Sequence, residues 1–213
     1  MPFGAAGGDV YAIDDVVPVV SPEAFVHPTA VLIGYVEVGP DCYIGPHASL
    51  RGDFGRVVVG AGTSVQDGCV VHVFPGREVV LGEGSLVGHN AVLHGCVLEP
   101  ESFVGIAATV MDGAVVGAGT LVGAHSFVPA DTVLAPRMLV AGNPARELRP
   151  LSEDEIGWTR NGQRVYRQLA RRSLATLRRT APLAQIPADR PGLAVDAEVS
   201  VPLRQYRAQQ DRE

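Results

Sequence analysis

Residues 104–134, VGIAATVMDGAVVGAGTLVGAHSFVPADTVL, repeat a unit of six residues. Each unit begins with an apolar residue, often followed by glycine, and has a small residue four positions after the apolar one. The apolar residues of the series are Val104, Val110, Val116, Val122, Val128 and Leu134. A period of six is a multiple of the two-residue period of a strand but not of the 3.6-residue period of a helix. The stretch therefore predicts short β-strands joined by turns.

The same unit occurs earlier in the chain, interrupted by two insertions. Extra residues are inserted around DFGR (53–56) and around FPGR (74–77). Strands this short cannot bury an apolar face alone and must stack on copies of themselves, so the repeat predicts a β-solenoid. We group the strands in threes by their apolar residues: 38, 44 and 50, then 59, 65 and 71, then 81, 87 and 93, then 98, 104 and 110.

This grouping places two histidines in one column. His72 and His94 each follow the apolar residue of a third strand, as do Arg51 and Met111. Neighbouring parallel strands lie about 4.8 Å apart, so the two imidazoles can both bind one metal ion. His89 belongs to a second strand and points from a different face or corner, so only a neighbouring chain could bring it to the pair. The pattern predicts three chains around a threefold axis and an open-sided site with three histidine ligands.

Other reactive side chains are interpreted as structural. His27, His47 and His125 are predicted to be surface or hydrogen-bonded residues without a function. Cys42 and Cys69 occupy the small-residue slot of the repeat, which predicts small buried groups.

The composition describes a globular chain and excludes several classes of partner. The 213 residues are 46% hydrophobic and 19% charged, with a net charge of −6, which gives no footprint for nucleic acid or an anionic membrane. No apolar run approaches the roughly 18 residues of a membrane span, and the N-terminal stretch lacks the basic start of a signal peptide. Three cysteines without a CxxC motif fit a reduced, cytoplasmic protein.

Four segments are expected. They are a lead-in (1–24), the β-solenoid (25–145), a helical segment (146–180) and a proline-rich extended tail (181–213). Ser152 followed by Glu155 is a capping-box pattern that starts the helix, and Asn161-Gly162 is a possible kink. The arginines of this region are interpreted as a solvated helix face, with an anion site as the alternative: Arg171, Arg172, Arg178 and Arg179.

Over nearly its whole length the chain resembles the γ-class carbonic anhydrase-like family of hexapeptide-repeat proteins. The stretches that carry the resemblance include FVHPTAVLIG (25–34), ASLRGDFGRVVVG (48–60), VQDGCVVH (65–72), VGHNAVLHGC (87–96) and VAGNPARELRPLSEDEI (140–156). The resemblance implies a left-handed parallel β-helix in which three strands form one 18-residue coil of a triangular prism. It also implies a homotrimer.

The resemblance assigns roles to seven residues. It implies that His72, His94 and the adjacent subunit's His89 bind a divalent metal, with zinc as the first choice and iron or cobalt as alternatives. The residues implied near the metal are Arg51, Asp53, Gln66 and Asp67. Asp67 can orient His89, and Gln66 can position water or substrate. For Arg51 and Asp53 the resemblance leaves two roles open, one in catalysis and one in an ion pair between subunits.

Within the family the chain is most similar to the branch of phenylacetate-degradation and carnitine-operon proteins. This implies hydrolysis of acyl-CoA thioesters by a metal-activated hydroxide at the subunit interface. Efficient carbonic anhydrases of the family carry glutamates that remove a proton at each turnover, whereas RGD is followed here by Phe54 and the loop 73–77 reads VFPGR. Reversible hydration of carbon dioxide to bicarbonate is therefore the alternative, and a non-catalytic, metal-stabilised trimeric scaffold is the second. A hexapeptide acyltransferase is less favoured because it needs a free histidine as general base.

Overall fold

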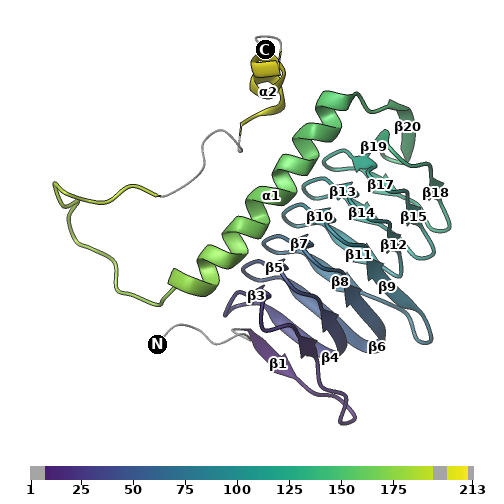
Figure 1. Ribbon diagram of the computed structural model, residues 1–213. Helices are drawn as coiled ribbons and strands as arrows, with labels where there is room; N and C mark the ends of the chain where they lie inside the picture. The colour runs from purple at the N-terminus through teal and green to yellow at the C-terminus, as the bar shows by residue number, and fades with distance from the viewer. Residues whose placement is uncertain (1–7, 194–200, 211–213) are drawn as a thin grey trace.

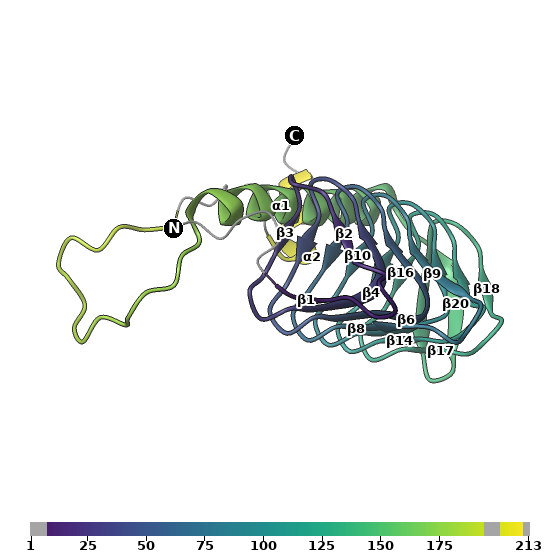
Figure 2. The same ribbon diagram turned by 90° about the horizontal axis from the view of Figure 1, so that it is seen from below.

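The repeat folds into a left-handed parallel β-helix with a C-terminal α-helix along one side, as predicted (Figure 1, Figure 2). The computed structural model describes residues 8–193 and 201–210. Each coil contributes strands to three faces of a prism, and equivalent strands of successive coils pair in parallel. We number the faces 1, 2 and 3 in the order in which the chain reaches them within a coil.

The strands distribute over the three faces as follows. Face 1 contains β2 (Val19–Val20), the ends of β4 (Val31–Val38) and β6 (Ser49–Val59), β9 (Glu78–Leu81), β12 (Val97–Leu98), β15 (Val115–Val116) and β18 (Val133–Leu134). Face 2 contains β3 (Phe25–Val26), β5 (Tyr43–Ile44), β7 (Ser64–Val65), β10 (Leu86–Val87), β13 (Phe103–Val104), β16 (Leu121–Val122), β19 (Met138–Gly142) and β20 (Ala145–Pro150). Face 3 contains β1 (Asp9–Tyr11), the starts of β4 and β6, β8 (Val70–His72), β11 (Val92–His94), β14 (Thr109–Val110) and β17 (Phe127–Val128).

The apolar residue of each repeat points into the prism and stacks on its equivalents in neighbouring coils. On face 3, Val71 pairs with Leu50, Leu93 pairs with Val71 and Val110 pairs with Leu93, and all four are fully buried. The pairings on the other two faces confirm the remaining columns of the predicted grouping. Burial of such aliphatic side chains contributes about 1.5–3 kcal/mol each relative to exposure. Because each strand supplies so few of them, stability depends on the stacking of coils.

Close contacts between coils explain why the repeat has glycine at its turns and small residues at its buried positions. Gly68 adopts a φ of 69°, and a Cβ at this position would lie 2.2 Å from Oδ1 of Asn90 in the next coil. Glycine is therefore required both for its backbone conformation and for its lack of a side chain. Cys42 and Cys69 are fully buried in the small-residue slot, and burial raises the pKa of each thiol to about 11. The thiols are thus neutral packing groups, as predicted.

The first coil begins earlier than the expected boundary at residue 25. β1 and β2 both pair with β4, so residues 9–20 are part of the β-helix rather than a separate lead-in. The hexapeptide spacing missed them because a tight turn at Asp14 and Asp15, both with positive φ, interrupts the repeat. Residues 1–7 lie outside the described residues. At the opposite end, β19 and β20 pair antiparallel and close the stack.

The helix α1 (Glu153–Thr176) lies along the outer side of face 2 (Figure 1, Figure 2). Its start confirms the predicted capping box, since Ser152 Oγ accepts from the backbone N–H of Glu155 and the Glu155 carboxylate accepts from that of Ser152. The helix continues unbroken through Asn161-Gly162, where the sequence indicated a kink or a split. Gly162 instead lets the helix approach the sheet, since a Cβ there would lie 3.2 Å from Cδ1 of Leu86.

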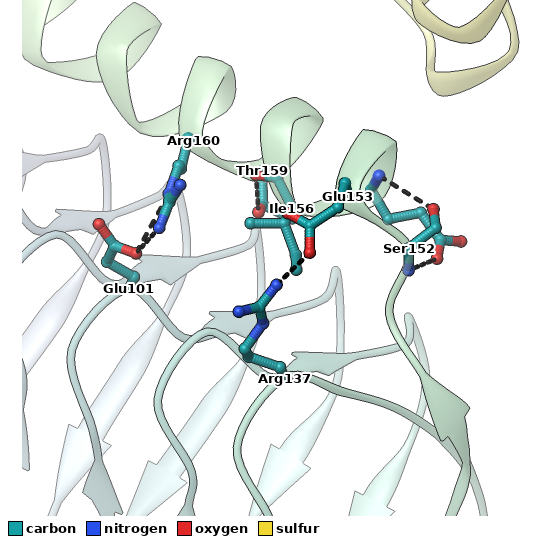
Figure 3. A network of polar contacts seen from close by, with 8 residues as sticks. Glu101, Arg137, Ser152, Glu153, Ile156, Thr159 and Arg160 are labelled. Atoms are coloured by element: carbon teal, nitrogen blue, oxygen red, sulfur yellow. Dashed lines mark hydrogen bonds and ion pairs between the residues drawn. The ribbon is translucent and has the colours of Figure 1, made fainter.

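Ion pairs fasten α1 to the corner between faces 1 and 2, and two of them are visible in Figure 3. The pairs are Glu153–Arg137, Arg160–Glu101 and Arg171–Asp41. A helical turn rises about 5.4 Å and a coil about 4.8 Å, so successive turns of the helix meet successive coils. This near match allows side chains about two or three turns apart to reach different coils along the prism.

The packing of α1 is expected to weaken in acid through Glu155. Two hydrogen bonds from the Arg149 guanidinium and one from the Ser152 N–H lower the pKa of Glu155 from 4.5 to about 2. A pKa that is lower in the folded state contributes stability above pH 4.5, and this contribution is lost as the pH falls toward 2. Thermal unfolding at pH 5 and pH 3 measures the loss. We expect a smaller pH-dependent change in Tm for Glu155→Gln than for wild type or the control Glu83→Gln, which changes an exposed carboxylate.

The tail departs from the predicted extended structure at α2 (Leu203–Gln210). Residues 203–210, LRQYRAQQ, contain good helix formers and no proline, which explains the short helix. The Trp158 indole N–H donates to the carbonyl of Val201 at 3.0 Å and ties this segment to α1. Among the described residues, no helix has the length and hydrophobicity needed to cross a membrane.

Candidate functional site

His72 and His94 lie side by side at the corner between faces 3 and 1. They end β8 and β11, which are neighbouring strands, and their Cα atoms are paired in register. Nδ1 of His72 lies 3.2 Å from Nε2 of His94. Both side chains are largely buried, with exposures of 13% and 20%. The structure therefore brings this predicted pair together within one chain.

A carboxylate holds the remote nitrogen of each imidazole. Nε2 of His72 lies 2.9 Å from Oδ1 of Asp53, and Nδ1 of His94 lies 2.8 Å from both carboxylate oxygens of Asp112. In the tautomer that has an N–H on the remote nitrogen, each ring donates to its carboxylate, and the two facing nitrogens then carry lone pairs. Asp112 was missed by the sequence analysis, although it lies 18 residues after His94, the spacing of one coil.

The facing nitrogens fit a metal ion. Two lone pairs at 3.2 Å repel each other unless a cation or proton lies between them. Two nitrogens bound to zinc at 2.0–2.1 Å with tetrahedral geometry would be roughly 3.3 Å apart. Histidines whose other nitrogen is held by a carboxylate are typical of metal centres. The donor set and its spacing therefore suit a divalent metal.

His89 lies away from this pair, at the corner between faces 2 and 3. Its Nδ1 is 2.8 Å from Oδ2 of Asp67, and its side chain is 38% exposed. Asp67 thus stands beside His89, where the sequence placed it. Within the described part of the chain no three histidine, cysteine or acidic side chains form a metal-binding group. Metal binding by His72, His89 and His94 together remains a prediction that requires a second chain.

The other predicted site residues divide between the two corners. Arg51 Nη1 donates to Oδ2 of Asp53 at 2.9 Å, so this ion pair forms within one chain. Asp53 thereby links Arg51 to His72. Gln66 follows β7 and is buried at the corner of Asp67 and His89. It cannot reach the His72–His94 pair of its own chain, because that pair lies at another corner.

Two exposed phenylalanines flank the histidine pair. The ring of Phe54 lies 5.5 Å from that of His72, and the ring of Phe74 lies 4.8 Å from that of His94 in an edge-on arrangement. Both rings are more than half exposed. A Cβ at Gly55 would lie 2.2 Å from the Arg77 carbonyl oxygen, so the two loops that carry the rings stack closely. The surroundings of the pair are therefore apolar on the open side.

Known proteins similar to this chain share its repeat. The carnitine operon protein CaiE of Escherichia coli K12 is 45% identical over 190 residues, which cover 89% of this chain and 97% of that protein. A solved structure of a presumed acetyltransferase from Bacillus cereus is 26% identical, with a TM-score of 0.78 over 80% of this chain and 99% of the other. A hexapeptide transferase family protein from Anaplasma phagocytophilum is 34% identical, with a TM-score of 0.74 over 76% and 96%. No protein-family model matches the chain.

Proposed function

The chain belongs to the CaiE-like family of hexapeptide-repeat proteins, and we propose that it hydrolyses acyl-CoA thioesters with the help of a divalent metal. The observation that carries this proposal is the pair of facing imidazole nitrogens, 3.2 Å apart, each on a ring whose other nitrogen is held by a carboxylate. The sequence resemblance to the phenylacetic acid degradation protein PaaY points to the same activity.

The proposed site lies between two subunits of a homotrimer. His72 and His94 would bind the metal together with His89 of the partner subunit. Zinc is the first choice, with iron or cobalt as alternatives. When bound, the metal supplies Lewis acidity and lowers the pKa of a water molecule to near 7.

The chain's own residues would orient these groups and the substrate. Asp53 and Asp112 keep the protons of His72 and His94 on their remote nitrogens, so the facing nitrogens stay available. Asp67 does the same for His89. Gln66, at the corner of His89, would enter from the partner subunit and position the thioester carbonyl or the attacking water. Phe54 and Phe74 offer apolar surface to an acyl group and exclude water.

Carbon dioxide hydration and acyl transfer are the two enzymatic alternatives to thioester hydrolysis. Reversible hydration of carbon dioxide needs rapid removal of a proton, and the loops beside His72 and His94 place phenylalanine rings there instead of glutamates. Acyl transfer is favoured by the names of the two structural neighbours. It needs a histidine free to act as a general base, whereas the proposed site assigns His72, His89 and His94 to the metal.

Metal analysis and parallel assays of His94→Ala test the proposal. Wild type is expected to contain close to one metal ion per chain and to hydrolyse acyl-CoA faster than it hydrates carbon dioxide. His94→Ala should lose the metal and at least a thousandfold in hydrolysis, because activation of water depends on the metal. The control His125→Asn changes an exposed histidine with a φ of 57°, a conformation that asparagine tolerates.

Each assay has an outcome that contradicts the proposal. If wild type cannot be loaded with metal, the assignment of a metal site would be contradicted. Fast carbon dioxide hydration without thioester hydrolysis would identify a γ-type carbonic anhydrase, and transfer of the acyl group to an amine or hydroxyl would identify an acyltransferase. A metal-containing trimer inactive in all three assays would support the scaffold.

A further inference from the structure

A cavity of about 330 Å³ lies between the segment that follows α1 and the turn that follows β3 in the first coil. Its lining residues are His27, Pro28, Thr29, Leu177, Arg178 and Arg179. The two arginines directly follow α1, and the other polar residues follow β3. Segments about 150 residues apart in the sequence thus form one wall with guanidinium, imidazole and hydroxyl groups.

The lining is positively charged in an acidic protein. It contains two arginines and no carboxylate, although the whole chain has a net charge of −6. Neither Arg178 nor Arg179 forms an ion pair or hydrogen bond with any described residue, whereas Arg171, one to two turns earlier, pairs with Asp41. Nδ1 of His27 accepts from the backbone N–H of Thr29, so the Thr29 hydroxyl, 2.9 Å away, donates to the same nitrogen, while its oxygen accepts from the His47 N–H.

The charge of the cavity comes from the arginines. Burial and the neighbouring His47 lower the pKa of His27, and the more distant Asp67 raises it only in part. His27 is therefore neutral at pH 7 and can act as a hydrogen-bond donor or acceptor. Two guanidinium groups and the Nε2–H of His27, whose Nδ1 accepts from Thr29, are a donor set that suits the oxygens of a phosphate group.

A role at the helix end alone does not account for this arrangement. Arginines near a helix C-terminus can compensate the helix dipole. Dipole compensation, however, needs no partner on the β-helix, while Arg178 and Arg179 line a cavity shared with His27 and Thr29. The two roles differ in what a substitution changes, since only a binding role alters affinity for an anion.

The cavity lies on the same corner of the prism as His89. His27 follows β3 and His89 follows β10, and β3, β5, β7 and β10 are consecutive strands of face 2. Three strand spacings of about 4.8 Å separate them along the prism axis by roughly 14 Å. The pantetheine arm of CoA contains two amide groups and, with the length of about four or five extended residues, spans roughly 15 Å.

We propose that Arg178, Arg179 and the Nε2–H of His27 bind a phosphate group of the CoA portion of the substrate. The pantetheine arm would run along the corner between faces 2 and 3, from this cavity to the thioester beside His89. The assignment of the thioester end rests on the proposed function. The phosphate site itself rests on the cavity and its charges.

Calorimetric titration of the full-length protein with CoA tests the site. Arg178→Gln/Arg179→Gln should raise the Kd for CoA by at least tenfold, because charge-assisted hydrogen bonds to phosphate are lost. Arg178→Lys/Arg179→Lys keeps both charges and should restore part of the affinity. Arg164→Gln is the matched control, since it removes an exposed arginine of α1 away from the cavity. Added inorganic phosphate should compete with CoA in wild type and not in the Gln double variant.

A kinetic ratio tests the link to the thioester. The ratio of kcat/KM for an acyl-CoA to that for the same acyl-pantetheine, which has no phosphate, should fall about tenfold in the Gln double variant and stay unchanged in Arg164→Gln. An unchanged Kd for CoA in the Gln double variant would overturn the phosphate site even if hydrolysis is found. If CoA binding depends on the arginines but no thioester is hydrolysed, the phosphate site would be supported and the proposed function would be contradicted. If the Gln double variant has a lower Tm and an unchanged Kd for CoA, the arginines stabilise the end of α1 and do not bind phosphate.

Discussion

Co-expressed His89→Ala and His94→Ala subunits are expected to regain about one quarter of wild-type thioester hydrolysis, although each variant alone is inactive. The reason is that His89 and His94 lie at different corners of one chain, so each proposed site combines them from two subunits. A His94→Ala subunit still provides its His89, and a His89→Ala subunit still provides its His72 and His94. In a random trimer from equal amounts of both, about one interface in four combines the two intact halves.

Native mass spectrometry of the mixture verifies that mixed trimers form. Metal content should recover in the same proportion as hydrolysis, which gives a readout independent of turnover. A mixture of His72→Ala with His94→Ala is the control, because both variants damage the same half of the site and no interface is repaired. Mixed trimers of His89→Ala and His94→Ala without activity or metal would show that the subunits do not share a site.

Leu98→Ala is expected to cost about 2–5 kcal/mol of unfolding free energy, the largest stability effect of any single change discussed here. Leu98 is fully buried on face 1 and stacks between Leu81 and Val116 of the neighbouring coils. Removing its side chain leaves a cavity that the stacked strands cannot fill, because backbone pairing on both sides fixes the coil spacing. A coil weakened in this way interrupts the stack on which its neighbours depend.

Val97→Ala is the matched control for Leu98→Ala. Val97 is the preceding residue of β12, its side chain points outward, and it is partly exposed. Urea unfolding at a fixed protein concentration, since oligomer stability depends on concentration, measures both variants. Equal losses for the two would contradict the inward and outward assignment of the strand.

The repeat could be predicted in detail because each coil contacts mainly the coils directly before and after it. Alternation along each strand determines which residue is buried, and equal spacing determines which residues stack. The columns 50, 71, 93 and 110, and the adjacent positions of His72 and His94, follow from these two rules. The rules fail where the spacing is interrupted, as at the turn of Asp14 and Asp15, and in the tail, where α2 lies outside the repeat.

The sequence by itself determined the β-helix, its register and the column that holds His72 and His94. Only the tertiary structure decided that Asp53 and Asp112 hold their remote nitrogens, and that Arg178 and Arg179 meet His27 in a cavity. The physical reason is that stacking repeats the same local contact in every coil. The contacts of side chains across corners, and of α1 with the first coil, depend on the path of the whole chain in space.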